Sequence, residues 1–184
     1  MSAFASKLLN VLLYQFGWFG CVLGAAWGSP VIGALIALAL VASHLLLARA
    51  RKSELLLICA AGLLGTVVDS LQQGLGILSF KTDSNWPFWL PLWVPVIWMQ
   101  FATLFRYALY WLSGRYLLAA LLGALGGPIA YWGGVNLGAA EISGEPALSL
   151  FFLAATWAVV TPALLWLSDQ TADGEGRYRW PAKS

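Results

Sequence analysis

Charged residues are scarce in this sequence: Asp, Glu, Lys and Arg make up 10% of the 184 residues, whereas 60% are hydrophobic. The mean hydropathy of +0.78 is far above that of ordinary soluble domains. The formal net charge of +2 is too small to indicate a nucleic-acid-binding surface. The composition therefore excludes a soluble globular domain and a nucleic-acid partner, and it indicates a polytopic membrane protein.

Residues that commonly carry chemistry are also few. The single histidine rules out the multi-histidine clusters of di-iron membrane enzymes, and two cysteines are too few for a disulfide framework. We find no Ser/His/Asp set, no P-loop, no CxxC pair and no acidic pair at metal-ligand spacing. We therefore expect no metal and no cofactor, and the sequence disfavours a hydrolase or a metalloenzyme. An enzyme that uses Asp69 and nearby glutamines stays open.

Long hydrophobic runs fill most of the chain. Each has about 17–25 residues, the length that spans a hydrocarbon core of roughly 30 Å. We predict an all-α bundle with transmembrane helices over Leu8–Trp27, Pro30–Ala48, Glu54–Leu78, Val96–Leu112, Tyr116–Trp132 and Pro146–Leu167, the last bent at Pro162. Residues 133–145 are expected to form a glycine-rich loop.

The predicted domain organisation is a single transmembrane domain, residues 1–168, followed by a polar cytoplasmic tail, residues 169–184. The tail contains Arg177, Arg179, Trp180 and Lys183. Basic and aromatic side chains of this kind can rest on an anionic membrane surface.

A stretch rich in proline and tryptophan, Trp86–Pro95, precedes the fourth predicted helix. Three prolines in nine residues would disrupt a regular helix, because each removes a backbone donor and clashes with the preceding turn. Tryptophan is favoured at the headgroup level of a bilayer. We therefore predict an interfacial segment here, followed by a spanning helix that begins at Val96.

The distribution of basic residues predicts the topology. With six crossings, one side receives Lys7, Arg49, Arg51, Lys52, Arg115, Arg177, Arg179 and Lys183, and the other receives only Lys81. This is a strong positive-inside asymmetry. The sequence therefore predicts a multi-pass protein of the bacterial inner membrane with both termini in the cytoplasm.

Polar residues in the third and fourth predicted helices indicate a candidate site in the outer half of the membrane. Asp69 lies about 22 Å from Glu54 along the helical rise, and Gln100 lies about 19 Å from Ser113, so the two are expected to meet. The predicted ligand-binding residues are Asp69, Gln72, Gln73, Gln100, Trp89, Trp93 and Tyr131. An intramembrane carboxylate can mark a functional site, but interhelical hydrogen bonds that hold the bundle together are an alternative role.

A second group is predicted nearer the cytoplasm. Arg106 lies about 10 Å and His44 about 8 Å inside the ends of their helices, and Asn10, Tyr14 and Tyr110 are expected close by. The guanidinium can bind an anion such as a lipid phosphate. Alternatively, Arg106 reaches the interface with its long side chain, and His44 is an ordinary hydrogen-bonded interior residue.

Three stretches resemble a bacterial inner-membrane family known only as domain of unknown function 2878. Its most specific pieces here are Gly65-Thr66-Val67-Val68-Asp69, the Pro/Trp run ending in Phe101-Ala102-Thr103-Leu104, and Gly126-Gly127-Pro128-Ile129-Ala130-Tyr131. After Thr103-Leu104, the resemblance implies a smaller, more polar sequence than Phe105-Arg106-Tyr107. It implies a six-helix inner-membrane protein whose relatives tend to lie near genes for lipid-modifying enzymes of the cyclopropane-fatty-acid-synthase type.

These observations predict a protein of membrane-lipid physiology that binds a lipid or small amphiphile in a pocket lined by polar and aromatic side chains. The expected partners are membrane lipids and a lipid-modifying enzyme. Three alternatives stay open: a small-solute transporter or substrate-capture subunit, an intramembrane lipid-modifying enzyme, and a scaffold for such an enzyme. Whether the protein is an enzyme is left open, with the absence of motifs favouring a non-catalytic role.

Overall fold

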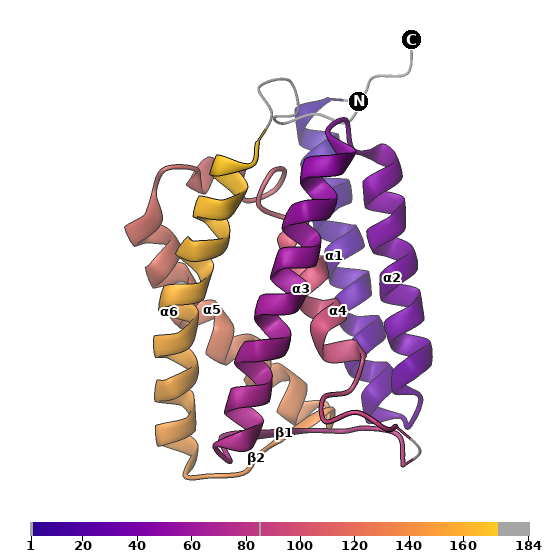
Figure 1. The fold of residues 1–184 in the computed structure, drawn as a ribbon, viewed down its shortest axis with the longest axis vertical. Helices are drawn as coiled ribbons and strands as arrows, with labels where there is room; N and C mark the ends of the chain where they lie inside the picture. Colours follow the sequence, from indigo (N-terminus) through magenta and orange to yellow (C-terminus); the bar gives the residue numbers. More distant parts are fainter. Residues whose placement is uncertain (1, 85, 173–184) are drawn as a thin grey trace.

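The computed structural model describes residues 2–84 and 86–172, which form six α-helices and a small two-stranded sheet (Figure 1). The helices are α1 (Ala3–Ala26), α2 (Pro30–Leu47), α3 (Arg51–Gly74), α4 (Trp93–Ala102), α5 (Tyr116–Asn136) and α6 (Pro146–Gln170). A 3-10 turn, η1 (Tyr110–Leu112), precedes α5, and the strands are β1 (Leu78–Phe80) and β2 (Ala140–Ile142).

Five of these helices, all except α4, are long and apolar enough to cross a membrane. The predicted helical membrane class is therefore confirmed. The start of α1 and the end of α6 lie at the same end of the bundle, and the two strands lie at the opposite end (Figure 1). The predicted tail residues Arg177, Arg179, Trp180 and Lys183 lie outside the described residues.

Small residues determine how α1 and α2 pack. Ser29 and Pro30 end the short turn between them, because proline is pre-organised for the first position of a helix. Gly24 of α1 faces Gly33 of α2 so closely that a Cβ at either glycine would collide with the other helix. These glycines thus allow the two helices to pack closely.

The same principle brings α5 and α6 together. A Cβ at Gly123 or Gly127 of α5 would overlap Thr161 or Trp157 of α6, so large side chains of α6 fill the space that the glycines leave. Pro162 lies inside α6, which continues to Gln170. The α5 helix extends four residues beyond the predicted end at Trp132 and reaches Asn136, which shortens the predicted loop.

The strands β1 and β2 are absent from the predicted architecture. Leu78 pairs with Ile142 and Phe80 with Ala140 in an antiparallel register. We predicted α3 to continue to Leu78, but it ends at Gly74 and the backbone turns at Gly76, whose φ is +68°. Strands of three residues in apolar surroundings have too little periodicity to be recognised in a sequence.

The prediction of a continuous fourth helix over Val96–Leu112 was wrong. Helix α4 ends at Ala102, and residues 103–109 form turns that lead into η1. Asn10 of α1 takes over the released backbone groups: its Nδ2 donates to the Thr103 carbonyl at 3.0 Å, and its Oδ1 accepts from the Ala108 N–H at 3.2 Å. Irregular backbone is tolerated at membrane depth only where the protein satisfies it in this way.

Helix α4 is the centre of one half of the bundle. It packs against α1, α2 and α3, and its residues Val96, Trp98 and Ala102 are almost completely buried. Helices α5 and α6 form a separate pair beside this group. The candidate functional site lies between the two groups.

Candidate functional site

A cavity of about 380 Å³ lies between α1, α4, α5 and α6. Its volume is within the range of ordinary small-molecule pockets. Its walls extend from Phe80 and Ala140 in the strands to Leu109 and Leu112 near the opposite end of the bundle. We call it the central cavity.

Glycines of α5 leave this space open. Gly123, Gly126, Gly127 and Gly134 line the central cavity without adding side-chain volume. Gly134 is buried, yet a Cβ built on it meets no atom within 4 Å. The space in front of Gly134 is therefore large enough to accept a side chain or part of a ligand.

The central cavity reaches the outer surface of the bundle through α5. Two of its lining residues, Leu122 and Gly126, are exposed, with Leu122 at 40%. Their neighbours Leu125 and Ile129 are large, exposed and apolar. In a membrane this face of α5 contacts lipid, so the opening leads toward the hydrocarbon region.

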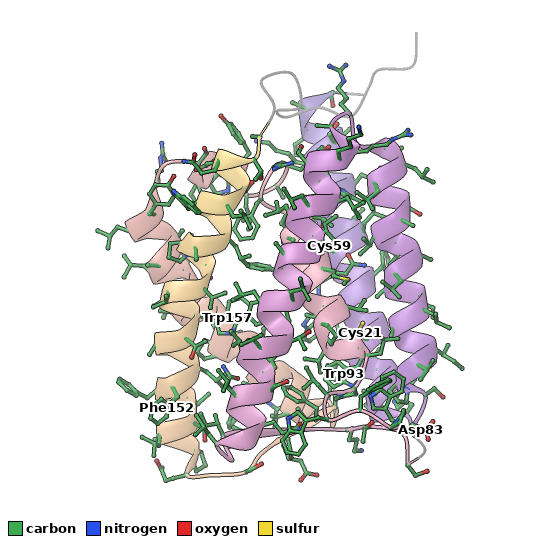
Figure 2. The ribbon with its side chains drawn as sticks, in the orientation of Figure 1. Cys21, Cys59, Asp83, Trp93, Phe152 and Trp157 are labelled. Carbon is green, nitrogen blue, oxygen red and sulfur yellow. The ribbon has the colours of Figure 1, made fainter. Side chains whose placement is uncertain are left out.

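Aromatic side chains form a continuous wall of the cavity. Successive ring contacts run from Trp93 through Phe80, Tyr131, Trp157 and Phe101 to Tyr14, with neighbouring ring centroids 5.4 to 6.4 Å apart. Trp157 also stacks on Trp98, with centroids 4.7 Å apart. Figure 2 shows Trp157 projecting from α6 into the bundle, whereas Phe152 of the same helix projects outward.

Asp69 of α3 is the acidic residue in this wall, and it is 1% exposed. Its Oδ2 accepts a hydrogen bond from Trp98 Nε1 at 2.7 Å, and its Oδ1 accepts one from the Tyr131 hydroxyl at 2.6 Å. Gly65, one turn earlier in α3, makes room for the Trp98 ring. The Asp69 carboxylate thus joins α3 to both α4 and α5.

The predicted meeting of Asp69 and Gln100 does not occur. The Gln100 amide lies against Gly17 of α1 and donates to the Ala37 carbonyl of α2 at 2.8 Å. Trp98 and Gln100 are two residues apart in α4 and therefore point in nearly opposite directions. The depth estimate also assumed an unbroken helix between Gln100 and Ser113, which the turns at 103–109 invalidate.

The other predicted site residues separate into two groups. Asp69, Trp93 and Tyr131 line the central cavity, whereas Gln72, Gln73 and Trp89 are absent from the lining. Gln73 donates to the backbone carbonyl of Trp89, whose side chain is 64% exposed. The Gln72 side chain is buried. The sequence therefore identified three of the residues that surround the cavity.

The second predicted group contains Arg106 and His44, and the structure adds Glu54 to it. Arg106 Nη1 lies 3.5 Å from Glu54 Oε1, and His44 Nε2 lies 3.4 Å from Glu54 Oε2. All three side chains are at least 94% buried. We call these three residues the Glu54 cluster.

Polar neighbours accept hydrogen bonds from both terminal nitrogens of Arg106. Its Nη1 donates to Ser53 Oγ at 2.9 Å, and its Nη2 donates to Thr171 Oγ1 at 2.7 Å. A carboxylate of the protein therefore occupies the place where we predicted a bound anion. Tyr14, expected in this group, lines the central cavity instead.

Residues that the sequence reasoning missed are Glu54, Trp98 and Trp157. Glu54 follows a basic loop and was read only as the start of a helix. Trp98 and Trp157 are two of eleven tryptophans, and composition alone does not distinguish them from the others. The sequence did contain a signal for Trp157. Trp157 and Thr161 are four residues apart, and so are Gly123 and Gly127, the glycines of α5 that face them.

Among residues 2–84 and 86–172, no group of three or more His, Cys, Asp or Glu side chains comes together as a possible metal site.

The five long apolar helices place this chain in the class of α-helical membrane proteins. Within this class, the chain belongs to the family described as "protein of unknown function (DUF2878)", whose sequence model matches residues 7–163. This confirms the resemblance predicted from the sequence motifs. No curated protein and no solved structure matches the chain.

Proposed function

We propose that this protein binds one chain of a lipid, or another small amphiphile, in the central cavity and acts in the lipid physiology of the bacterial inner membrane. The observation that carries the proposal is the combination of an apolar cavity and an opening on the face of α5 at Leu122 and Gly126. A ligand that enters there comes from the hydrocarbon region, because the surrounding surface is apolar.

The composition of the walls supports an amphiphile over a polar solute. Large aromatic and aliphatic side chains dominate, and Asp69, Tyr131 and Trp98 supply a small polar group on one side. Ligand pockets commonly combine apolar walls with a few polar groups that orient the ligand. An acyl chain fits the elongated apolar part, and its head group would lie toward the polar side.

The charge distribution supports an orientation with both termini in the cytoplasm. The end of the bundle where α1 begins carries Lys7, Arg49, Arg51, Lys52 and Arg115, and the strand end carries Lys81. Basic residues favour the cytoplasmic side. In this orientation the strands and the segment Trp86–Pro95 lie on the side of the membrane opposite the cytoplasm.

The test fills the cavity and measures the bound lipid. Gly134→Phe places a ring in the open space in front of Gly134, and Leu125→Phe adds the same ring on the exposed face of α5 as a control. Native mass spectrometry of the purified proteins measures co-purified amphiphile.

We expect wild type and Leu125→Phe to retain the same species and Gly134→Phe to lose most of it. Equal occupancy in all three proteins, or no bound amphiphile in wild type, would contradict the proposal.

A further inference from the structure

The Asp69 carboxylate has no cationic partner among the described residues. In residues 2–84 and 86–172, the ion pairs within 4.0 Å are His44–Glu54 and Arg106–Glu54, and both lie in the Glu54 cluster. The groups that donate to Asp69 are an indole N–H and a phenol, and both are neutral. A charge buried in apolar surroundings is costly unless something neutralises it.

The two donors leave acceptor capacity on Asp69. A carboxylate has about four lone-pair positions, and Trp98 and Tyr131 use one on each oxygen. Asp69 also lines the central cavity, so a ligand in the cavity lies against it. The carboxylate can therefore serve as the counter-ion of a bound cation.

The rings around Asp69 suit a cation of a particular kind. Trp157 contacts both rings that donate to the carboxylate, Trp98 and Tyr131, and Phe101 continues the wall. Aromatic faces attract ammonium groups, and aromatic cages are known for binding quaternary ammonium ligands. An inorganic cation would instead need several oxygen ligands, and among the described residues no three His, Cys, Asp or Glu side chains come together.

We propose that the central cavity selects amphiphiles whose head group is an amine or a quaternary ammonium, with Asp69 as counter-ion and Tyr131, Trp98 and Trp157 as an aromatic cage. This inference rests on the proposed function, because it names the class of ligand for the same cavity. The apolar length of the cavity holds the chain, and the polar side next to α3 holds the cationic head.

The experiment compares two probes with the same chain and different heads, dodecyltrimethylammonium and dodecanol. Both are titrated into the purified full-length protein in an uncharged detergent, and native mass spectrometry counts the bound copies. The measured quantity is the ratio of the two affinities. Comparing this ratio between variants in the same detergent cancels the partitioning of each probe into micelles.

Wild type is expected to prefer the cationic probe by at least about tenfold. Asp69→Asn removes the negative charge with little change in shape, and the ratio should fall toward one. Glu141→Gln removes an acid from the exposed surface of β2 at the same end of the bundle and should leave the ratio unchanged. Equal ratios in wild type and Asp69→Asn would overturn the inference.

A second variant keeps the test decisive if Asp69→Asn does not fold. Tyr131→Phe keeps the ring but removes one neutral donor from Asp69, so the preference for the cation should stay or rise. A fall of the ratio toward one in Tyr131→Phe would contradict the role of Asp69 as counter-ion.

Failure of the proposed function is distinguishable from failure of this inference. If Gly134→Phe abolishes binding of both probes but wild type binds them equally, the cavity binds amphiphiles without charge selection. If Gly134→Phe does not reduce the binding of either probe, both proposals are wrong.

The cation can belong to a free amphiphile or to a lipid head group. Two further titrations use lysophosphatidylethanolamine and lysophosphatidylglycerol, each with a single chain of the same length as that of the other probes. A preference for the ethanolamine lipid that Asp69→Asn removes assigns the site to a lipid ammonium group. A preference confined to dodecyltrimethylammonium assigns it to a free cationic amphiphile.

Discussion

Two buried acidic residues of α3 have opposite surroundings. Glu54 lies near the end of the bundle that holds the termini and pairs with Arg106 and His44. Asp69 lies four turns further along the same helix, and among residues 2–84 and 86–172 its hydrogen-bond donors are the neutral groups of Trp98 and Tyr131. Both carboxylates are 1% exposed, so burial alone does not distinguish them.

The difference lies in what surrounds each carboxylate. The Glu54 cluster is separate from the central cavity, because Ser53 and Thr171 accept from the two terminal nitrogens of Arg106 and no lining residue of the cavity belongs to the cluster. Asp69 stands beside a cavity, and among the described residues no cationic side chain lies within 4.0 Å of it. A paired buried charge is typical of structure, whereas an unmatched one beside a cavity is typical of a ligand site.

The largest effect on stability is expected from Glu54→Gln. This change leaves Arg106 buried without a negative partner, and breaking a buried pair in this way costs about 3–5 kcal/mol of the free energy of unfolding. Unfolding in mixed micelles with increasing dodecyl sulfate, followed by circular dichroism, measures the loss. The same substitution at exposed Glu141 is the control and should change stability by less than about 0.5 kcal/mol.

A loss at Glu54 below about 1 kcal/mol would show that Arg106 finds another partner and that the Glu54 cluster is not a structural ion-pair group.

The contrast between these two residues also shows what the sequence could and could not predict. Hydrophobic length was enough to predict five spanning helices, and the rarity of acidic residues in such helices was enough to select Asp69. The partners of Asp69 could not be predicted. Either Trp98 or Gln100 could face Asp69 until the rotation of α4 about its own axis is known. Glu54 was overlooked because its burial depends on Arg106, which is brought close by turns that no periodicity indicates.

An intermediate effect is expected from Asn10→Leu. Asn10 is fully buried and holds the Thr103 carbonyl and the Ala108 N–H, so the change leaves two backbone groups of the turn region without partners. The loss should be about 2–3 kcal/mol in the same unfolding assay. It should also increase the hydrogen-exchange rate of the Ala108 amide, because the turn that carries Arg106 toward Glu54 loses its anchor.

Asn136→Leu is the matched control for Asn10. The Asn136 side chain is exposed, and among the described residues it bonds to the Trp132 carbonyl one turn earlier in α5. Stability should change by less than about 0.5 kcal/mol. If the two leucine variants lost similar stability, the turns at 103–109 would not depend on Asn10.

The smallest effect is expected from Asp69→Asn, the counterpart of Glu54→Gln in the other region. The asparagine Oδ1 still accepts one hydrogen bond, and its amide leaves the second donor without a partner, which costs about 1–2 kcal/mol. No cation is left unpaired, because the described residues place none beside Asp69. The two matched amide substitutions in one helix therefore separate the two roles. Glu54→Gln should reduce stability by at least about 1 kcal/mol more than Asp69→Asn, whereas only Asp69→Asn should change the ligand preference of the cavity. A stability loss at Asp69 equal to that at Glu54, with no change in bound ligand, would assign both carboxylates to structure.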